Sequence, residues 1–216
     1  MKKALVVYSG GLDSTVLLNE AYFTYDKVEA LTFNYGSKHN NKEVMCAIQQ
    51  CYALNITHTI IPLSFIKQYF KSALVENSRD IPHGHYAAEN MKSTVVPFRN
   101  GIMLSIAAGF AESRGLDEVL LASHSGDHYI YPDCRPEFNA AMINAINEGT
   151  DYKVELKFPF ESLYKWDIVK IGAGLNVDFS KTYSCYEGGE KPCGKCGTCV
   201  ERAEAFKNAG VDDPLV

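Results

Sequence analysis

The stretch from Ala4 to Leu18 constrains the fold of this chain more than any other part of the sequence. Its first part, Ala4 to Tyr8, is an apolar run typical of a buried strand, and two adjacent glycines follow shortly after it. A helical pattern of apolar residues comes next. Because glycine lacks a Cβ, a glycine pair at such a junction lets the backbone turn sharply and approach an anion closely.

The helix after the glycines has the features of a phosphate-binding site. Its first N–H groups have no partner within the helix, and they lie at the positive end of the helix dipole. Ser9, Ser14 and Thr15 add hydroxyl groups. We therefore predict a phosphate cradle, whereas a Gly-Gly pair by itself would favour an ordinary strand-to-helix turn.

The spacing of this loop distinguishes it from two common nucleotide-binding motifs. It lacks the lysine of the G-x-x-x-x-G-K-[ST] loop, and it is not the G-x-G-x-x-G motif of dinucleotide-binding folds. The run Ser9 to Thr15 instead resembles the pyrophosphatase-type loop of adenylating enzymes, which holds the β- and γ-phosphates of ATP while a nucleophile takes AMP. The positions that this resemblance implies for ATP are Tyr8, Ser9, Gly10, Gly11, Leu12, Asp13, Ser14, Thr15, Val16, Leu17 and Leu18.

Composition restricts the class of protein. The 216 residues suffice for one domain with an appendage, and 46% hydrophobic and 22% charged residues are usual for a globular protein. A net charge of -5 argues against a tRNA or DNA surface, which needs clustered Lys and Arg. No apolar window of about 20 residues is present, and the chain starts with a strand pattern rather than a signal peptide. We expect a cytoplasmic protein with no membrane and no direct nucleic-acid partner.

Strand and helix patterns alternate along the chain. Strands are expected at 4–8, 28–33, 56–63, 118–122 and 154–158, and helices after the first loop and at 41–54, 99–114, 136–146 and 166–175. This alternation predicts an α/β fold with a doubly wound, mostly parallel sheet. Cys46 and Cys51 fall on the second helix and are expected to be core residues.

The segment from Ser64 to Thr94 breaks this alternation. It is too long for an ordinary connector, and it includes Asn77 to Asp80 and Ile81 to His85. We interpret it as an excursion on the substrate side of the sheet. His83 and His85 lack neighbouring metal-binding partners in the sequence, so we expect them to be ordinary loop residues.

Two further segments are expected at the same edge of the sheet as the first loop, one at the start of a helix and one directly after a strand. Arg99 and Asn100 stand at a helix start, and a dense polar and aromatic run, residues 123–138, follows the fourth strand. Open α/β sheets bind ligands at the carboxyl ends of their strands. Both runs are therefore candidates for a ligand site, although a single Arg is by default solvated.

The last fifth of the chain contains a cysteine cluster. Four of the seven cysteines form a C-x7-C-x2-C-x2-C pattern: Cys185, Cys193, Cys196 and Cys199. Four thiolates at this spacing can surround one structural Zn²⁺ and fix a tail too poor in apolar residues to fold alone. An iron–sulfur cluster is the competing interpretation, and disulfides come third because the expected compartment is reducing.

Together these motifs resemble the 7-cyano-7-deazaguanine synthase family, whose product is the nitrile base precursor of queuosine. The similarity covers nearly the whole chain, and the runs that carry it are Ser9 to Ser14, Val96 to Asn100, Tyr131 to Phe138, Lys165 ahead of Ile168-Val169, Ser184 to Tyr186, and Pro192 to Cys199. Many members have an Asp-Tyr-Ser-Gly-like stretch where this chain has Gly126 to Ile130, so the contacts of residues 127–130 stay open. The resemblance implies an adenine nucleotide alpha hydrolase-like, Rossmann-like sheet and a homodimer.

The resemblance also implies a carbon–nitrogen ligase that forms AMP and pyrophosphate. ATP adenylates the carboxylate of 7-carboxy-7-deazaguanine, ammonia displaces AMP to give an amide, and a second adenylation of the amide oxygen yields the nitrile. An amide oxygen is a poor leaving group, so a second AMP transfer is a sensible route to dehydration. The rivals are a tRNA-modifying relative with the same loop and a zinc-held nucleotide-binding regulator without catalysis.

The catalytic positions implied are Asp13, Lys165 and Arg99. Asp13 would hold the Mg²⁺ that accompanies ATP, and Lys165 would act as a point charge on the phosphates, although alone it would be taken for a surface residue. The substrate-binding positions implied are Arg99, Asn100, Asp133, Arg135 and Glu137.

Two of these roles follow from side-chain chemistry. Arg135 suits a bidentate contact with a carboxylate, and Asp133 or Glu137 suits a guanine-like amino edge. Cys134 is not expected to be a nucleophile, because AMP already activates the substrate. We expect residues 1–180 to form the ATP pyrophosphatase-type domain and residues 181–216 the zinc-binding segment packed on it.

Overall fold

The computed structural model describes residues 1–75 and 80–215 of the chain. Within these residues, five strands form one sheet in the order β3-β2-β1-β4-β5. The strands are β1 (Lys3–Val7), β2 (Lys27–Asn34), β3 (Thr57–Pro62), β4 (Glu118–Leu120) and β5 (Glu155–Lys157). All four pairings are parallel, which confirms the predicted doubly wound sheet.

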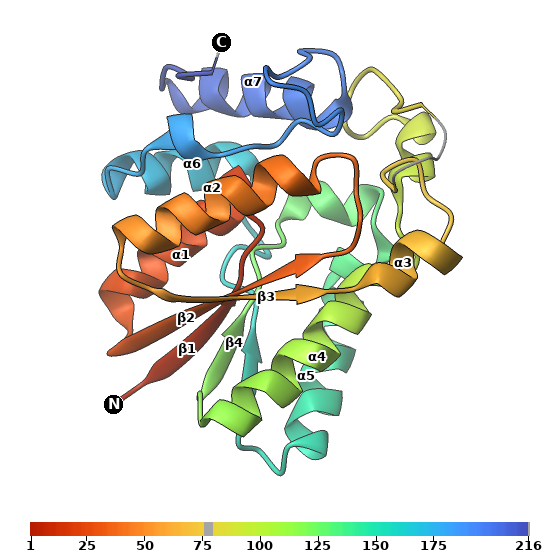
Figure 1. The fold of residues 1–216 in the computed structure, drawn as a ribbon. Coiled ribbons are helices and arrows are strands. Elements are labelled where there is room, and N and C mark those ends of the chain that lie inside the picture. Colours follow the sequence, from red (N-terminus) through yellow and green to blue (C-terminus); the bar gives the residue numbers. More distant parts are fainter. Residues whose placement is uncertain (76–79, 216) are drawn as a thin grey trace.

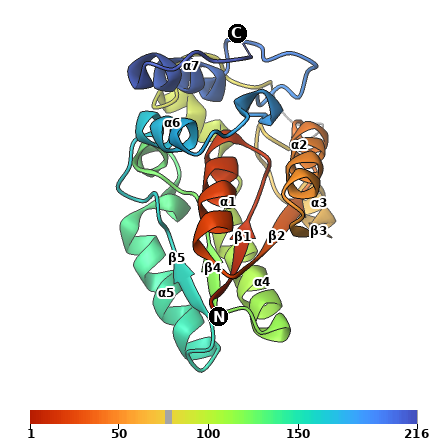
Figure 2. The same cartoon turned by 90° about the vertical axis from the view of Figure 1, so that its left-hand side faces the viewer.

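Helices cover both faces of this sheet (Figures 1 and 2). They are α1 (Leu12–Thr24), α2 (Asn40–Ala53), α3 (Ser64–Tyr69), α4 (Arg99–Arg114), α5 (Pro136–Gly149), α6 (Lys165–Gly174) and α7 (Gly197–Ala209). One core lies between the sheet and α1, α2, α6 and α7, and the other lies between the sheet and α4 and α5. No helix among the described residues is long and apolar enough to cross a membrane.

The first βα unit is the centre of the molecule. Four of the five residues of β1 are buried, because helices cover both faces of a parallel sheet and leave no polar side for alternation. Helix α1 is buried on most of its surface, since it lies between the sheet and α6. Gly172 permits that close approach: a Cβ on it would lie 2.7 Å from Val16 Cγ2 and 2.6 Å from the Phe179 ring.

The Ser64–Thr94 segment packs against the fold more closely than its weak periodicity indicated. It contains α3 and a 3₁₀ helix (Glu89–Thr94), and Leu74, Ile81 and Met91 are buried. Short turns of this kind produce no long repeat, which explains the weak pattern. The predicted excursion includes residues 76–79, which lie outside the described residues.

The C-terminal segment packs on the sheet domain through α7. Phe206 is buried, and its ring makes an edge-to-face contact with Phe179, with centroids 5.1 Å apart. Figure 1 shows α7 lying along α6 on the outside of the molecule. The division into units at residue 180 stays a prediction.

Candidate active site

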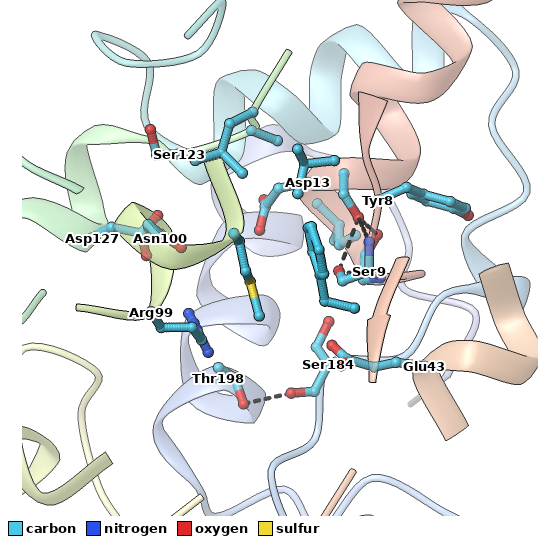
Figure 3. A pocket seen from close by; sticks show the side chains of 18 of the residues that line it. Tyr8, Ser9, Asp13, Glu43, Arg99, Asn100, Ser123, Asp127, Ser184 and Thr198 are labelled. Carbon is cyan, nitrogen blue, oxygen red and sulfur yellow. Dashed lines mark hydrogen bonds between the residues drawn. The ribbon is translucent and has the colours of Figure 1, made fainter. Parts of the chain in front are cut away.

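A cavity lies at the carboxyl ends of β1, β2 and β4. Its lining comes from the loop after β1, the end of β2, the starts of α2 and α4, the segment after β4, Lys165, and two parts of the C-terminal segment. The strand order reverses between β1 and β4, and open α/β sheets bind ligands at such a switch point. Figure 3 labels side chains around the cavity from the loop after β1, the starts of α2 and α4, the segment after β4 and the C-terminal segment.

The glycine loop has a tightly constrained geometry. Gly10 has a φ of +89°, and a Cβ on it would lie 2.2 Å from the backbone oxygen of Glu43 in α2. Gly11 has an ordinary φ of -75° at the start of α1, and its N–H donates to Ser9 Oγ over 3.1 Å. The Ser9 and Ser14 hydroxyls are 3.0 Å apart (Figure 3). The loop thus directs two hydroxyl groups and a helix N-terminus at the cavity.

The residues predicted to bind ATP divide into two groups. Tyr8, Ser9, Gly11, Leu12, Asp13 and Ser14 line the cavity, and Gly10, Thr15, Val16, Leu17 and Leu18 do not. The Thr15 hydroxyl donates to the Gly11 carbonyl over 2.7 Å and lies 3.2 Å from the Tyr8 hydroxyl. Val16, Leu17 and Leu18 belong to the core beneath the loop.

Lys165 forms the centre of a buried charge cluster on one wall. Its Nζ lies 3.2 Å from Asp13 Oδ2 and 2.6 Å from Glu201 Oε2. Burial alone would lower the pKa of Lys165, but the charges of Asp13 and Glu201 raise it well above its ordinary value. The ammonium group is therefore held protonated beside the loop, as the sequence-based role requires.

His124 and Asp127 complete this cluster. His124 Nδ1 accepts a hydrogen bond from the N–H of Gly126 over 3.0 Å, which leaves Nε2 as the protonated ring nitrogen. That nitrogen is buried without a hydrogen-bond partner, 3.7 Å from Asp127 Oδ2 and 3.9 Å from Asp13 Oδ2. Asp127 Oδ1 accepts a hydrogen bond from the Tyr86 hydroxyl over 2.9 Å. Burial would raise the pKa of Asp127, but attraction to neighbouring positive charge lowers it.

A second polar pair lies on another part of the cavity wall. Arg99 Nη1 donates to the Tyr35 hydroxyl over 3.0 Å, and its guanidinium lies 5.5 Å from the centre of that ring. Glu43 Oε2 is 3.5 Å from His39 Nε2. Burial raises the pKa of Glu43 to about 8 and lowers that of His39 to about 4. Sequence reasoning missed Glu43, since a Glu in a first helical turn is usually explained by the helix dipole.

The predicted substrate-binding residues lie in different places. Asn100 lines the cavity, and its N–H donates to Asp133 Oδ2 over 2.8 Å, so the buried Asp133 caps α4. Arg135 and Glu137 are exposed and do not line the cavity, and Arg135 Nε donates to the His128 carbonyl over 3.0 Å. The structure therefore brings Arg99 and Asn100 to the site and leaves Arg135 and Glu137 outside it.

Cys134 is a cysteine at the cavity, and from the sequence we do not expect it to act as a nucleophile. Its Sγ lines the cavity and accepts a hydrogen bond from Asn100 Nδ2 over 3.1 Å. Burial raises the pKa of Cys134 well above its ordinary value. A thiol held protonated in this way is a poor nucleophile, which agrees with the role expected from the sequence.

The four C-terminal cysteines form a candidate metal centre. The Sγ atoms of Cys185, Cys193, Cys196 and Cys199 all lie within 4.8 Å of one another. Tetrahedral Zn–S bonds of about 2.3 Å require sulfur atoms about 3.8 Å apart. Backbone N–H groups point at the sulfurs, as that of Cys193 does toward Cys185 Sγ over 3.3 Å. Four sulfur donors, with backbone N–H groups donating to them, fit a structural metal ion.

This centre also supports the cavity wall. Residues 81–86 lie along it: His83 forms a β-bridge with Cys196, and the Gly84 N–H donates to the Lys195 carbonyl over 3.0 Å. His83 and His85 pair with carboxylates, Glu187 at 3.3 Å and Glu204 at 3.5 Å. The metal-binding segment thereby holds in place the loop that carries Tyr86 into the cavity.

A family model and several relatives of known name assign this chain to the same protein family. A family model described as queuosine biosynthesis protein QueC matches residues 3–210. The 7-cyano-7-deazaguanine synthase of Desulfotalea psychrophila is 53% identical over 208 residues, covering 96% of this chain and 95% of the relative. The enzyme of the same name from Porphyromonas gingivalis is 52% identical over 213 residues, covering 99% and 96%. That from Methanoregula boonei is 48% identical, covering 99% and 98%.

Solved structures of more distant proteins share the fold. The U34-tRNA thiolase NcsA from Methanococcus maripaludis, solved with its [4Fe-4S] cluster, has a TM-score of 0.52 at 16% identity, over 96% of this chain and 67% of its own. NMN synthetase from Francisella tularensis has a TM-score of 0.53 at 14% identity, over 97% and 77%. At these identities the similarity shows the adenine nucleotide alpha hydrolase fold alone.

Proposed function

The chain belongs to the QueC family of queuosine biosynthesis proteins, and on that premise we propose that it converts 7-carboxy-7-deazaguanine and ammonia into 7-cyano-7-deazaguanine with ATP. Relatives at 48% to 53% identity carry the name of this activity. The single structural observation that carries the proposal is the cavity in which the glycine loop, Lys165 and Arg99 come together. In reaction class the protein is a carbon–nitrogen ligase that releases AMP and pyrophosphate.

The proposed chemistry has two adenylation steps. In the first, a carboxylate oxygen of the substrate attacks the α-phosphorus of ATP, and pyrophosphate leaves. Ammonia then adds to the acyl adenylate, loses a proton and expels AMP, which leaves the amide. In the second, the amide oxygen attacks the α-phosphorus of another ATP, and pyrophosphate leaves. Loss of AMP and of both nitrogen-bound protons then produces the C≡N bond. Two ATP molecules are thus consumed for each nitrile formed from the acid.

The glycine loop and Lys165 support the departure of pyrophosphate. Free N–H groups at the start of α1 and the two Ser hydroxyls face the cavity, so they can hold the β- and γ-phosphates. Lys165 would add a fixed positive charge there, taking the place of the lysine that P-loop proteins carry in the loop itself. In the free protein this charge is balanced by Asp13 and Glu201. Binding of a triphosphate would exchange one of these partners for phosphate oxygen.

Asp13 is the proposed contact for Mg²⁺. Its Oδ1 is buried at the loop without a hydrogen-bond partner, and an oxygen in that state fits a hard cation. Mg²⁺ bound with ATP would offset negative charge on the phosphate oxygens during transfer.

Arg99 is the proposed anchor for the substrate's carboxylate. Its guanidinium faces the cavity, and one N–H group is used by Tyr35, which leaves others for a planar carboxylate. The corresponding sequence-based assignment of Arg135 has less support, because Arg135 is exposed outside the cavity. Asn100 and Asp133 would act indirectly, by fixing the start of α4 and so the position of Arg99.

The cysteine centre is proposed to hold one structural Zn²⁺. Four thiolates fill a tetrahedral shell and leave no position for substrate. An iron–sulfur cluster is the alternative, since the U34-tRNA thiolase that shares this fold was solved with a [4Fe-4S] cluster. Metal analysis of the protein purified without oxygen distinguishes the two, since zinc gives one metal atom per chain and no visible absorption band. The homodimer remains a proposal drawn from the family resemblance, and the cytoplasmic location remains a proposal drawn from the sequence.

The experiment that tests the proposed function is a product analysis. The protein is incubated with ATP, Mg²⁺, ammonium and 7-carboxy-7-deazaguanine, and the products are identified by mass. We expect AMP, pyrophosphate and the nitrile. Binding of ATP without these products would favour a nucleotide-binding regulator. Salt-sensitive binding of tRNA would favour a tRNA-modifying enzyme, against which the net charge of -5 already argues.

A further inference from the structure

Among the described residues, three carboxyl groups line the cavity, and they differ in their hydrogen-bond and ion-pair partners. Asp13 pairs with Lys165 at 3.2 Å, and Asp127 accepts hydrogen bonds from the Tyr86 hydroxyl and from the backbone N–H of His124. Glu43 has a weaker neighbour: His39 Nε2 lies 3.5 Å away, and burial lowers the pKa of that imidazole to about 4. At neutral pH the ring is uncharged. Among the described cavity residues, Glu43 is therefore the carboxyl group that neither a cation nor a close hydrogen-bond donor holds.

The burial of Glu43 has no evident structural explanation. An acidic residue in a first helical turn can stabilise the helix dipole, but an exposed side chain does this equally well. Only 14% of the Glu43 side chain is exposed, and Oε1 lies 3.8 Å from the position that a Cβ on Gly11 would occupy. The side chain thus extends across the glycine loop toward the cavity. Burial without a strong partner disfavours the charged carboxylate and raises the pKa of Glu43 to about 8.

Arg99 is the complement of Glu43 in the same cavity. Among the described residues Arg99 forms no ion pair, and Figure 3 shows it entering from the side of Asn100, whereas Glu43 enters from the side of Ser9. The lining of the same cavity also includes aromatic and thioether side chains: Phe33, Tyr35, Met103, Tyr131 and Tyr186. A ligand that satisfies both ends is flat, with an anionic group at one end and N–H donors at the other.

We propose that Glu43 accepts the N1–H and 2-amino hydrogens of the deazaguanine ring, and that it selects substrates carrying this donor pair. The inference rests on the proposed function, which supplies the ring. Two parallel N–H groups on one edge match the two oxygens of a carboxylate, as Arg matches a carboxylate at the other end. By donating to Glu43 they would favour the charged form, which burial disfavours in the free protein. Asp133 and Glu137, which the sequence suggested for this edge, are a helix cap and an exposed residue. Glu43 is thus a specificity-determining residue.

The test uses the full-length protein, two ring substrates and one conservative substitution. Glu43→Gln keeps the size of the side chain and one acceptor but removes the charge and the second acceptor. Wild type and variant are assayed for pyrophosphate release with 7-carboxy-7-deazaguanine and with its analogue lacking the 2-amino group. Glu112→Gln, on α4 and 36% exposed, is the matched control, because it makes the same chemical change away from the cavity. Thermal melting establishes that each variant is folded.

A charge-assisted hydrogen bond contributes enough for an effect of about 10- to 100-fold. We expect wild type to prefer the 2-amino substrate over the analogue by about this factor in kcat/KM. Glu43→Gln should lose a similar factor with the 2-amino substrate, lose most of the preference, and change the KM for ATP less than threefold. Glu112→Gln should behave as wild type.

The outcomes separate this inference from the proposed function. If wild type forms no nitrile from the acid, the proposed function itself is wrong. If wild type forms the nitrile and Glu43→Gln keeps the preference for the 2-amino substrate, Glu43 does not read the ring edge. A rise in the KM for ATP with an unchanged KM for the acid would place Glu43 against the nucleotide and overturn the inference. If Glu43→Gln does not fold, binding of 7-deazaguanine and its 2-deamino analogue to wild type decides: equal affinities exclude the proposed contact.

Discussion

Replacing Gly10 by alanine should destabilise the fold, because the glycine loop packs directly against the backbone of α2. A Cβ at this position would lie 2.2 Å from the Glu43 backbone oxygen and 2.9 Å from the Ala47 nitrogen. Both atoms belong to the backbone of α2, so no flexible side chain can move aside. The φ of +89° adds strain, because it lies in a region that L residues rarely adopt.

The magnitude follows from these two effects. A left-handed backbone costs an alanine about 1–2 kcal/mol, and overpacking costs about 1–3 kcal/mol more. We expect the free energy of unfolding to fall by about 3 kcal/mol, which for a chain of this length lowers Tm by about 6–12 °C.

Urea unfolding followed by circular dichroism measures this loss. Gly109→Ala is the matched control: Gly109 is exposed within α4, and nothing lies within 4 Å of the Cβ it would gain. That variant should be more stable than wild type by about 0.5–1 kcal/mol, since alanine favours a helix over glycine. Equal unfolding free energies for Gly10→Ala and wild type would refute the reasoning about the loop and its contact with α2.

Three further changes test other parts of the site. Lys165→Met leaves the carboxylates of Asp13 and Glu201 without their cation. The free energy of unfolding should therefore fall by about 3 kcal/mol, and the rate of pyrophosphate release by at least about 100-fold. A stable, active variant would exclude Lys165 from the site. Removing the metal with a chelator should lower Tm and stop pyrophosphate release, because the cysteine segment holds the loop that carries Tyr86; a metal-free protein with full activity would contradict this. Arg99→Lys should raise the KM for the acid at least about tenfold through loss of a bidentate contact, whereas a rise in KM for Arg135→Lys with none for Arg99→Lys would restore the sequence-based assignment of Arg135.

The sheet and its loop were predictable because their signals are local. The strand predicted at 28–33 is β2 (Lys27–Asn34), and the helix predicted at 99–114 has those bounds in the structure. Buried parallel strands appear as continuous apolar runs, and a glycine pair at a strand end marks a sharp turn. The cysteine spacing was equally informative, since four ligands within 15 residues can meet without help from the rest of the fold.

Helix α7 was not predicted, and its packing explains why. Its buried side includes Arg202, which donates to Asp213 Oδ2 over 2.7 Å and to the Thr182 hydroxyl over 2.8 Å. A buried, fully paired arginine looks like a surface residue in the sequence. Only Phe206 and small residues mark the apolar side, which is too weak a pattern to identify a helix.

The substrate side of the cavity was harder to predict because it is built from turns. The run from Tyr131 to Phe138 passes through a 3₁₀ turn, which directs Tyr131 and Cys134 into the cavity and leaves Arg135 and Glu137 exposed. Neither a 3.6-residue nor a 2-residue period applies there, so side-chain direction cannot be read from the sequence. Glu43 and Glu201 gave no local signal, since each is an ordinary acidic residue on a helix until the fold buries it.

The claim on which this account depends is that the amino-terminal loop retains the β- and γ-phosphates of ATP while AMP is transferred. The most direct test follows ATP labelled separately at the α- and γ-phosphates through turnover of 7-carboxy-7-deazaguanine with ammonium. We expect the α-label to appear in AMP and the γ-label in pyrophosphate, with two AMP per nitrile. Appearance of the α-label in ADP and the γ-label in inorganic phosphate, in proportion to nitrile, would contradict the claim.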